Sequence, residues 1–166
     1  MLKINYIKNI LKISCIFPIL FQSSCAQYKE RENIIVASAG KIESLDPAQA
    51  NTLRTLQILS ALGDTIYKIN KEGNLSPSLA KDLPKVSKNG LLIDIPLKEN
   101  ISFHDGSIFN AEAMAFSLNR FRKIGTLNYL LNEKIEDIEV KEEFLLRIKL
   151  KKPSSSLTSL LTSVNL

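Results

Sequence analysis

Apolar residues alternate with other residues in one segment of this 166-residue chain, residues 91–97. Such a period of two predicts a strand with one buried face. The positions assigned to the buried face are Leu91, Ile93, Ile95 and Leu97. Pro96 lacks a backbone N–H, so we expect it at a sheet edge or at the end of the strand.

Three further segments have strand character. The β-branched run at residues 33–39 (NIIVASA) predicts a first, largely buried strand, and residues 65–69 predict a second one. Residues 71–74 (KEGN) supply a turn after the second strand. In residues 138–150, two apolar segments flank the charged turn Lys141, Glu142, Glu143, which predicts a hairpin.

Two helices are expected between these strands. Asn51 or Thr52 can cap a helix whose apolar stripe ends before Gly63, where we expect a left-handed C-cap. The stripe consists of Leu53, Leu56, Leu59 and Leu62. Asn110 opens a second helix that ends at Gly125. Its apolar face consists of Ala111, Met114, Leu118 and Phe121.

A last apolar pattern lies near the end of the sequence. Its positions, Leu157, Leu160, Leu161 and Val164, have the spacing of one helix face. Because no later segment follows to cover this face, we expect it to be an exposed apolar stripe that promotes association.

The first 25 residues form a segment of their own. Three lysines precede or enter the apolar run at residues 13–21, which is shorter than the roughly 20 residues of a membrane-spanning helix. This arrangement predicts a secretory signal peptide at residues 1–25. Ser23, Ser24 and Cys25 resemble a bacterial lipobox, but Gln22 stands where that motif has an aliphatic residue. Lipidation at Cys25 and ordinary cleavage therefore both remain open, with a buried N-terminal hydrophobic helix as a third alternative.

Cysteine count and charge change once this segment is set aside. Cys15 and Cys25 are the two cysteines, so signal removal leaves no disulfide partner in the mature chain. The leader holds three of the 22 basic residues, which leaves 19 against 17 acidic residues, a net charge near +2. That balance gives no reason to expect a nucleic-acid partner.

Several short motifs occur in a fixed order over about 85 residues. They are S-L-D-P at residues 44–47, L-x-P-x-L-A at 75–80, S-x-N-G at 87–90 and F-H-D-G at 103–106, followed by the helix that Asn110 opens. In this order the motifs resemble the N-terminal part of family 5 extracellular solute-binding proteins, the peptide- and nickel-type binding proteins of ABC importers.

The resemblance implies a mixed α/β (α+β) fold, the incomplete N-terminal portion of a periplasmic-binding-protein type II-like structure with two lobes. It implies that residues 26–72 begin the first lobe and that residues 73–166 form much of a small accessory domain, incomplete at its C-terminal end. Family members hold solute in a cleft between the lobes. We expect Asn51 and Thr52 to approach ligand, although capping of the next helix is the simpler role for both.

Candidate catalytic and metal sites are weak in this sequence. His104 is the only histidine, so a multi-histidine metal site is not expected, and we assign His104, Asp105 and Gly106 to a structural turn. The acidic cluster at residues 133–139 is interleaved with lysine and indicates a solvated face. We therefore expect no enzyme activity, no metal and no cofactor.

Two functional classes remain. The first is an exported solute-binding component, periplasmic or held at the cell envelope by lipid, that serves an ABC permease. Its solute would be an oligopeptide or a related compound, and the remainder of the protein is either missing or separately encoded. The second is a small envelope protein that has a structural or interaction role and binds no solute.

Overall fold

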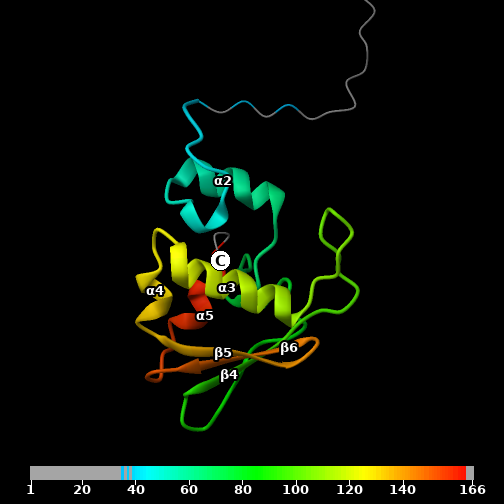
Figure 1. Cartoon of the computed structure of the whole chain (residues 1–166), viewed down its shortest axis with the longest axis vertical. Coiled ribbons are helices and arrows are strands. Elements are labelled where there is room, and N and C mark those ends of the chain that lie inside the picture. Colours follow the sequence, from blue (N-terminus) through cyan, green and yellow to red (C-terminus); the bar gives the residue numbers. More distant parts are fainter. Residues whose placement is uncertain (1–34, 36, 38, 164–166) are drawn as a thin grey trace, which may run out of the picture. The chain divides into compact units, whose positions relative to one another are not determined.

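The computed structural model describes residues 35, 37 and 39–163. The predicted leader, Cys25 and Val164 lie outside the described residues. The described part is mixed α/β (Figure 1). In chain order its elements are η2 (Pro47–Gln49), α2 (Leu53–Leu62), β1 (Tyr67–Ile69), β2 (Leu75–Pro77), β3 (Lys85–Val86), β4 (Leu92–Pro96), α3 (Ala111–Ile124), α4 (Tyr129–Asn132), β5 (Ile135–Glu142), β6 (Leu145–Leu150) and α5 (Leu157–Leu160).

A four-stranded antiparallel sheet with the order β3-β4-β6-β5 forms the base of the fold. The predicted alternation in residues 91–97 is confirmed, because Ile93, Ile95 and Leu97 are buried on one face. Pro96 is the last residue of β4, in the predicted strand-end position. β5 and β6 form the predicted hairpin, with Ile138 opposite Ile148. Its turn is Glu143 and Phe144, one residue later than predicted, because Lys141 and Glu142 still belong to β5.

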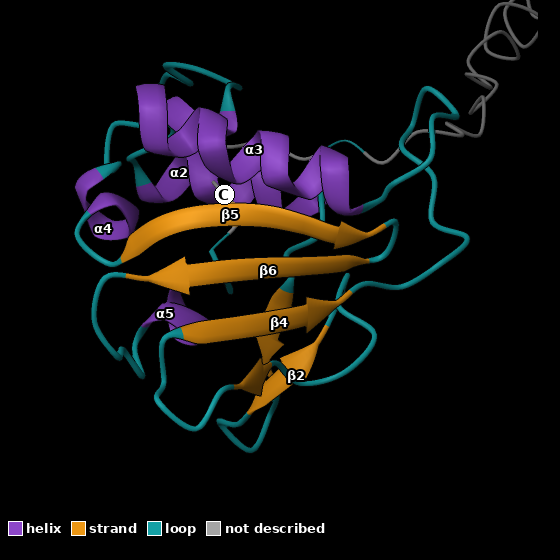
Figure 2. Cartoon of the chain, turned by 60° about the horizontal axis from the view of Figure 1, so that its bottom comes forward, coloured by secondary structure: helices purple, strands orange, loops and turns teal. Residues whose placement is uncertain are grey.

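Helix α3 packs along one face of this sheet (Figure 2). Its buried residues and those of the sheet form one hydrophobic core. The Asn110 side chain accepts a hydrogen bond from the Ala113 N–H at 3.0 Å, as the capping prediction required. Leu118 and Phe121 are buried against the sheet with the rest of the predicted apolar face. Gly125 ends the helix, and its N–H donates to the Phe121 carbonyl.

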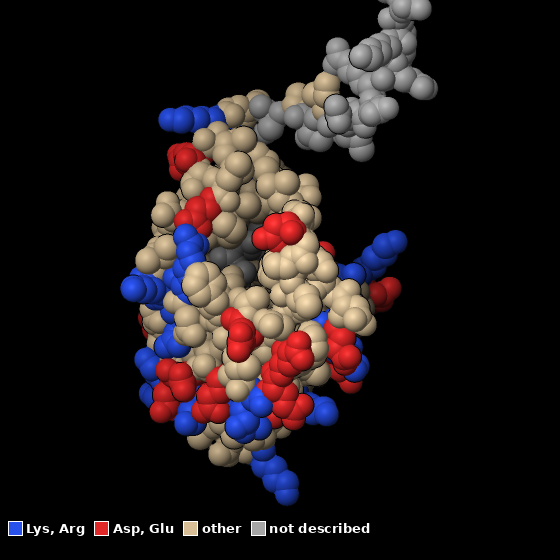
Figure 3. All heavy atoms as spheres, turned by 45° about the vertical axis from the view of Figure 1, so that its right-hand side comes forward, with Lys and Arg blue, Asp and Glu red and all other residues tan. Residues whose placement is uncertain are grey.

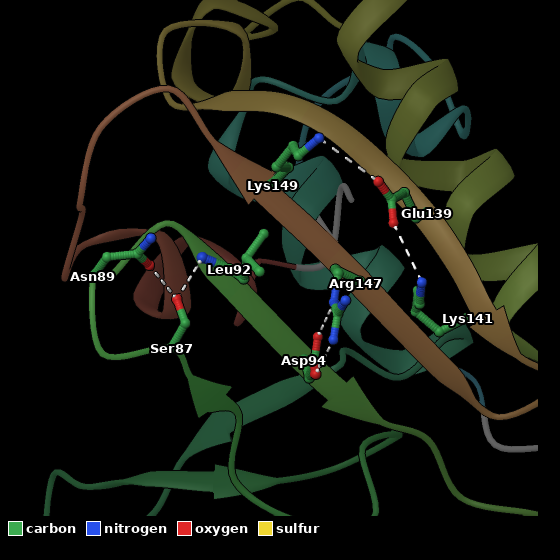
Figure 4. Close-up of polar contacts among 8 residues, drawn as sticks. All are labelled: Ser87, Asn89, Leu92, Asp94, Glu139, Lys141, Arg147 and Lys149. Atoms are coloured by element: carbon green, nitrogen blue, oxygen red, sulfur yellow. Dashed lines mark hydrogen bonds and ion pairs between the residues drawn. The ribbon is translucent and has the colours of Figure 1, made fainter.

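The opposite face of the sheet is polar and holds its strands together through charge pairs (Figure 4). Arg147 on β6 donates two hydrogen bonds to Asp94 on β4, at 2.6 and 2.7 Å. The Glu139 carboxylate on β5 lies 3.8 Å from the Lys141 Nζ of the same strand and 3.9 Å from the Lys149 Nζ of β6. Asp94 and Arg147 lie directly opposite each other, so their pairing favours the observed register of β4 against β6.

β1 and β2 form a separate two-stranded antiparallel sheet, and the predicted turn connects them. Gly73 adopts a positive φ of 82° there, and the Asn70 side chain accepts the Asn74 N–H at 2.8 Å. Tyr67 on β1 is fully buried. Burial raises the pKa of its hydroxyl well above the ordinary value.

Helix α2 forms where it was predicted, but its buried residues and its C-cap conformation differ from the predicted ones. Thr55 and Leu59 are its buried residues, whereas Leu53 is 74% exposed. The predicted stripe used three-residue steps, each about 60° short of a full turn, so its first leucine rotates away from the core. Gly63 has an extended backbone with φ −151°, so the predicted left-handed C-cap is wrong.

The predictions for residues 33–39 and for the C-terminal apolar stripe also change. Of the strand expected at residues 33–39, the described Ile35, Ala37 and Ala39 are not in a strand. No strand among the described residues pairs with them, and an unpaired segment has no ladder to join. The exposed C-terminal stripe is also wrong, because Leu157 and Leu161 are buried in the main core.

Candidate functional site

The S-L-D-P segment is built as a short, self-capped turn. Ser44 Oγ accepts the Asp46 N–H at 3.0 Å, and Asp46 Oδ1 accepts the Ala48 N–H at 3.1 Å. Asp46 is thereby the N-cap of η2, and Pro47 follows at the first helical position, where its missing N–H costs nothing. The sequence of this motif therefore specifies its own local fold.

Arg120 on α3 fixes this segment to the rest of the fold. Its two terminal nitrogens donate to the two Asp46 carboxylate oxygens at 2.8 and 2.6 Å. This bidentate geometry is the strong form of a charge-assisted hydrogen bond. The hydrogen bond from Arg120 holds the pKa of the Asp46 carboxyl below its ordinary value of 3.8. The pair joins positions that are 74 residues apart.

A second anchor lies just beyond the pair. The Thr126 N–H donates to the Ala48 carbonyl at 2.9 Å, and the Thr126 hydroxyl donates to the Gln49 carbonyl at 3.3 Å. Ala48 and Ala50 are buried. The segment that precedes Asn51 is thus held by the carboxylate of Asp46 and by the backbone carbonyls of Ala48 and Gln49. The groups that hold it come from α3 and the residues directly after α3.

The two predicted ligand residues follow these anchors. Asn51 is exposed. The Thr52 hydroxyl is the N-cap of α2, since it accepts the Thr55 N–H at 3.4 Å and lies 2.9 Å from the Thr55 hydroxyl. The capping role expected as the simpler alternative is therefore present at Thr52, and contact of either residue with a solute stays a prediction.

The F-H-D-G turn has the structural role that its sequence predicted. Gly106 has a φ of +87°, and the Gly106 N–H donates to the Phe103 carbonyl at 2.9 Å. Asp105 Oδ1 accepts both the Ser107 N–H at 2.9 Å and the Ser107 hydroxyl at 2.7 Å. These bonds hold the pKa of the Asp105 carboxyl below its ordinary value. Phe103 packs edge-on against Phe109, which ties the turn to the core.

A cavity of about 270 Å³ lies between this turn, the end of α2 and helix α3. Its apolar wall includes Ile66, Phe109 and Met114, which belong to the buried core. Polar groups that line it include Asp64, His104 and Ser117. Neither Asn51 nor Thr52 lines this cavity.

One face of the molecule carries charged side chains of both signs (Figure 3). Figure 3 shows basic and acidic side chains intermixed over the lower part of one face. Among the described residues, no group of three or more His, Cys, Asp or Glu side chains could hold a metal ion. Within the same residues, no helix is long and apolar enough to cross a membrane.

The comparison with known families decides the assignment. The family model of the bacterial extracellular solute-binding proteins, family 5 Middle, matches residues 74–166. The chain belongs to this family. The glutathione-binding protein GsiB of Escherichia coli is 30% identical over 132 residues, a match that spans 78% of this chain and 26% of GsiB. The chain thus spans about a quarter of the length of the curated relatives it matches.

Solved structures give the same fold. Listeria monocytogenes OppA bound to peptide superposes on 77% of this chain and 28% of its own length, with a TM-score of 0.71 and 20% identity. NikZ from Campylobacter jejuni, in complex with Ni(L-His), superposes on 74% of this chain and 25% of its own, with a TM-score of 0.63 and 25% identity. The expected mixed α/β fold of the type II-like binding proteins is therefore confirmed.

Proposed function

We propose that this chain forms the N-terminal part of a solute-binding component of an ABC importer. The family match over residues 74–166 is the observation that carries the proposal. The solute class we infer is an oligopeptide or a related small compound, since the similar proteins include a glutathione-binding protein and a structure bound to peptide. The partner of the complete protein is a membrane permease of the ABC type.

Asn51 and Thr52 are the residues that we propose lie nearest the solute. Two properties support this placement. The segment before them is held by Asp46–Arg120 and by the Thr126 hydrogen bonds, so its position is fixed before any solute arrives. Asn51 is exposed and offers both an amide donor and a carbonyl acceptor. A fixed backbone with an exposed polar group suits a site that orients its ligand.

The leader gives the proposed location and domain division. A basic start and a short apolar run support export, with residues 1–25 removed or with Cys25 kept as a lipid anchor. The binding protein would then work in the periplasm or at the outer surface of the membrane. Residues 26–72 would begin the first lobe, and residues 73–166 would belong to the accessory domain. In this proposal the chain binds solute and carries out no reaction.

Uptake by cells that lack this gene tests the proposal. We expect such cells to take up a labelled oligopeptide or labelled glutathione more slowly than the parent, and we expect a plasmid copy of the gene to restore the rate. A matched plasmid with Arg120→Gln should restore it less well, because the anchored segment loses its ion pair. Unchanged uptake of both solutes in the deletion strain would favour the alternative, an envelope protein without a transported solute.

A further inference from the structure

The turn between β3 and β4 contains the S-x-N-G motif, which the proposed function does not use. The Gly90 N–H donates to the Ser87 carbonyl at 2.8 Å and closes the turn, and Gly90 has a positive φ of 69°. Asn89 directly precedes Gly90 and is exposed. Water therefore reaches the side-chain amide of Asn89.

An asparagine that precedes glycine can react with its own backbone. The backbone nitrogen of the next residue attacks the side-chain amide carbon and closes a succinimide ring, with loss of ammonia. Glycine favours this reaction because it has no Cβ and allows a close approach to its backbone. Asn89 is the only asparagine of the sequence that precedes a glycine.

Two hydrogen bonds hold the oxygen of the Asn89 amide. The Ser87 hydroxyl donates to Asn89 Oδ1 at 2.7 Å, and the Leu91 N–H donates to the same oxygen at 3.1 Å. Figure 4 shows Ser87 between Asn89 and Leu92, whose N–H donates to Ser87 Oγ at 2.9 Å. Attack on the amide carbon places negative charge on Oδ1. Two donors that already point at this oxygen stabilise that charge, as in an oxyanion hole.

Asn70 provides a matched comparison within the chain. Its Oδ1 accepts the Glu72 N–H at 3.1 Å and the Asn74 N–H at 2.8 Å, so two donors hold this amide oxygen as well. The next residue is Lys71, whose side chain crowds the backbone nitrogen that would have to attack. Asn70 therefore has the donors but lacks the glycine.

Asp105 provides the opposite comparison. It precedes Gly106 in an exposed turn, so the glycine is present. Its side chain is a carboxylate at neutral pH, since the hydrogen bonds from Ser107 hold the pKa of the Asp105 carboxyl below its ordinary value. A carboxylate resists attack by a nucleophile far more than an amide does. Of these three residues, only Asn89 combines an amide, a following glycine and two donors.

We propose that Asn89 is a site of spontaneous deamidation that the Ser87 hydroxyl assists. The Gly90 nitrogen gives its proton to solvent and forms a bond to the Asn89 side-chain carbon. The bond from that carbon to Nδ2 breaks, and Nδ2 takes up a proton from water and leaves as ammonia. A water molecule then opens the succinimide and leaves aspartate or isoaspartate at position 89. The net reaction consumes water, releases ammonia and transfers no electrons.

The turn accommodates the aspartate product. A carboxylate at position 89 accepts the same hydrogen bonds from the Ser87 hydroxyl and the Leu91 N–H, and both become charge-assisted. Isoaspartate adds a methylene group to the backbone close to the paired residues Val86 and Ile93 of β3 and β4. When it ends in aspartate, the reaction thus adds a negative charge to the turn and keeps its hydrogen bonds.

Peptide mapping by mass spectrometry tests the proposal on the full chain. The chain is kept in buffer at neutral pH, and digests taken over time are compared with a digest at time zero. We expect the amide at Asn89 to be replaced by acid at least about tenfold faster than the amide at Asn70. The rate at Asn89 should increase with pH, because the Gly90 nitrogen must lose its proton.

Substitutions separate the assistance from the sequence effect. Ser87→Ala removes a donor to the oxyanion and should slow conversion at least about threefold, whereas Ser87→Thr keeps the hydroxyl and should keep the rate. The matched control Ser107→Ala removes a hydroxyl from the F-H-D-G turn and should leave Asn89 unchanged. Lys71→Gly places a glycine after Asn70, and we expect Asn70 then to convert at a rate similar to that of Asn89.

Three results would overturn the inference. They are conversion of Asn89 no faster than that of Asn70 in the parent chain, an unchanged or faster rate in Ser87→Ala, and an unreactive Asn70 in Lys71→Gly. The last result does not depend on how Ser87→Ala folds, because Lys71 is exposed in a different turn. None of these measurements requires a bound solute, so the outcome is independent of the proposed function.

Discussion

Replacing Gly106 by alanine isolates the backbone requirement of the F-H-D-G turn. A Cβ built at Gly106 meets no atom within 4 Å, so steric contact with neighbours contributes nothing to the cost. What remains is the φ of +87°. The left-handed region costs an L-residue about 1–2 kcal/mol, and loss of glycine's freedom in the unfolded chain offsets about 0.4–1 kcal/mol of this. We expect a net loss near 1 kcal/mol for Gly106→Ala and about 1–3 kcal/mol for Gly106→Val.

Gly63 provides a matched control for this prediction. Its Cβ would also meet no atom within 4 Å, but its φ of −151° is open to any residue. Gly63→Ala should therefore be neutral or slightly stabilising. Urea unfolding followed by circular dichroism gives the free energy of unfolding for each variant. Equal stability of Gly106→Ala and Gly63→Ala would show that the turn does not use a positive φ in solution.

Three further predictions concern acid stability, the lone histidine and export. The carboxyl groups of Asp46 and Asp94 have pKa values below 3.8 in the folded chain, so as the pH falls the unfolded chain takes up protons before the folded chain does. The free energy of unfolding should therefore stay constant down to about pH 5 and decrease below about pH 4. The decrease should be less steep in Asp46→Asn. His104→Ala should cost less than Gly106→Val in a thermal melt, and a stability loss that depends on added metal would contradict its structural role. Mass spectrometry should find envelope protein without residues 1–24, and Cys25→Ala should remove any lipid mass; a cytosolic chain with an intact Met1 would refute export.

Local structure was largely predictable where side chains act on their own backbone. Asn110 caps α3, the Asp105 carboxylate bonds Ser107, and the alternation in residues 91–97 places Ile93 and Ile95 in the core. Each depends on neighbours within a few positions, so spacing alone carries the signal. The wrong prediction of a left-handed C-cap at Gly63 also concerns local structure. A glycine after a helix permits a left-handed cap without requiring it.

Contacts between distant segments were not predictable in this way. Nothing in the spacing of Asp46 and Arg120 indicates that they meet, although an acidic residue in an ordered motif and an arginine inside a helix are each visible in the sequence. The burial of Leu157 and Leu161 likewise depends on where the chain returns after β6. The cavity is also a product of packing, since its walls come from α2, α3 and the F-H-D-G turn.

Calorimetric titration tests the central claim most directly, namely that this chain is one part of a solute-binding protein whose site needs the rest of the family fold. A cleft that closes on its ligand needs two walls. We predict no saturable heat when short peptides or glutathione are titrated into the monomeric chain alone. We predict saturable binding once the portion of a family 5 protein that this chain does not match is supplied. Micromolar binding of a short peptide by the monomeric chain alone would contradict the account.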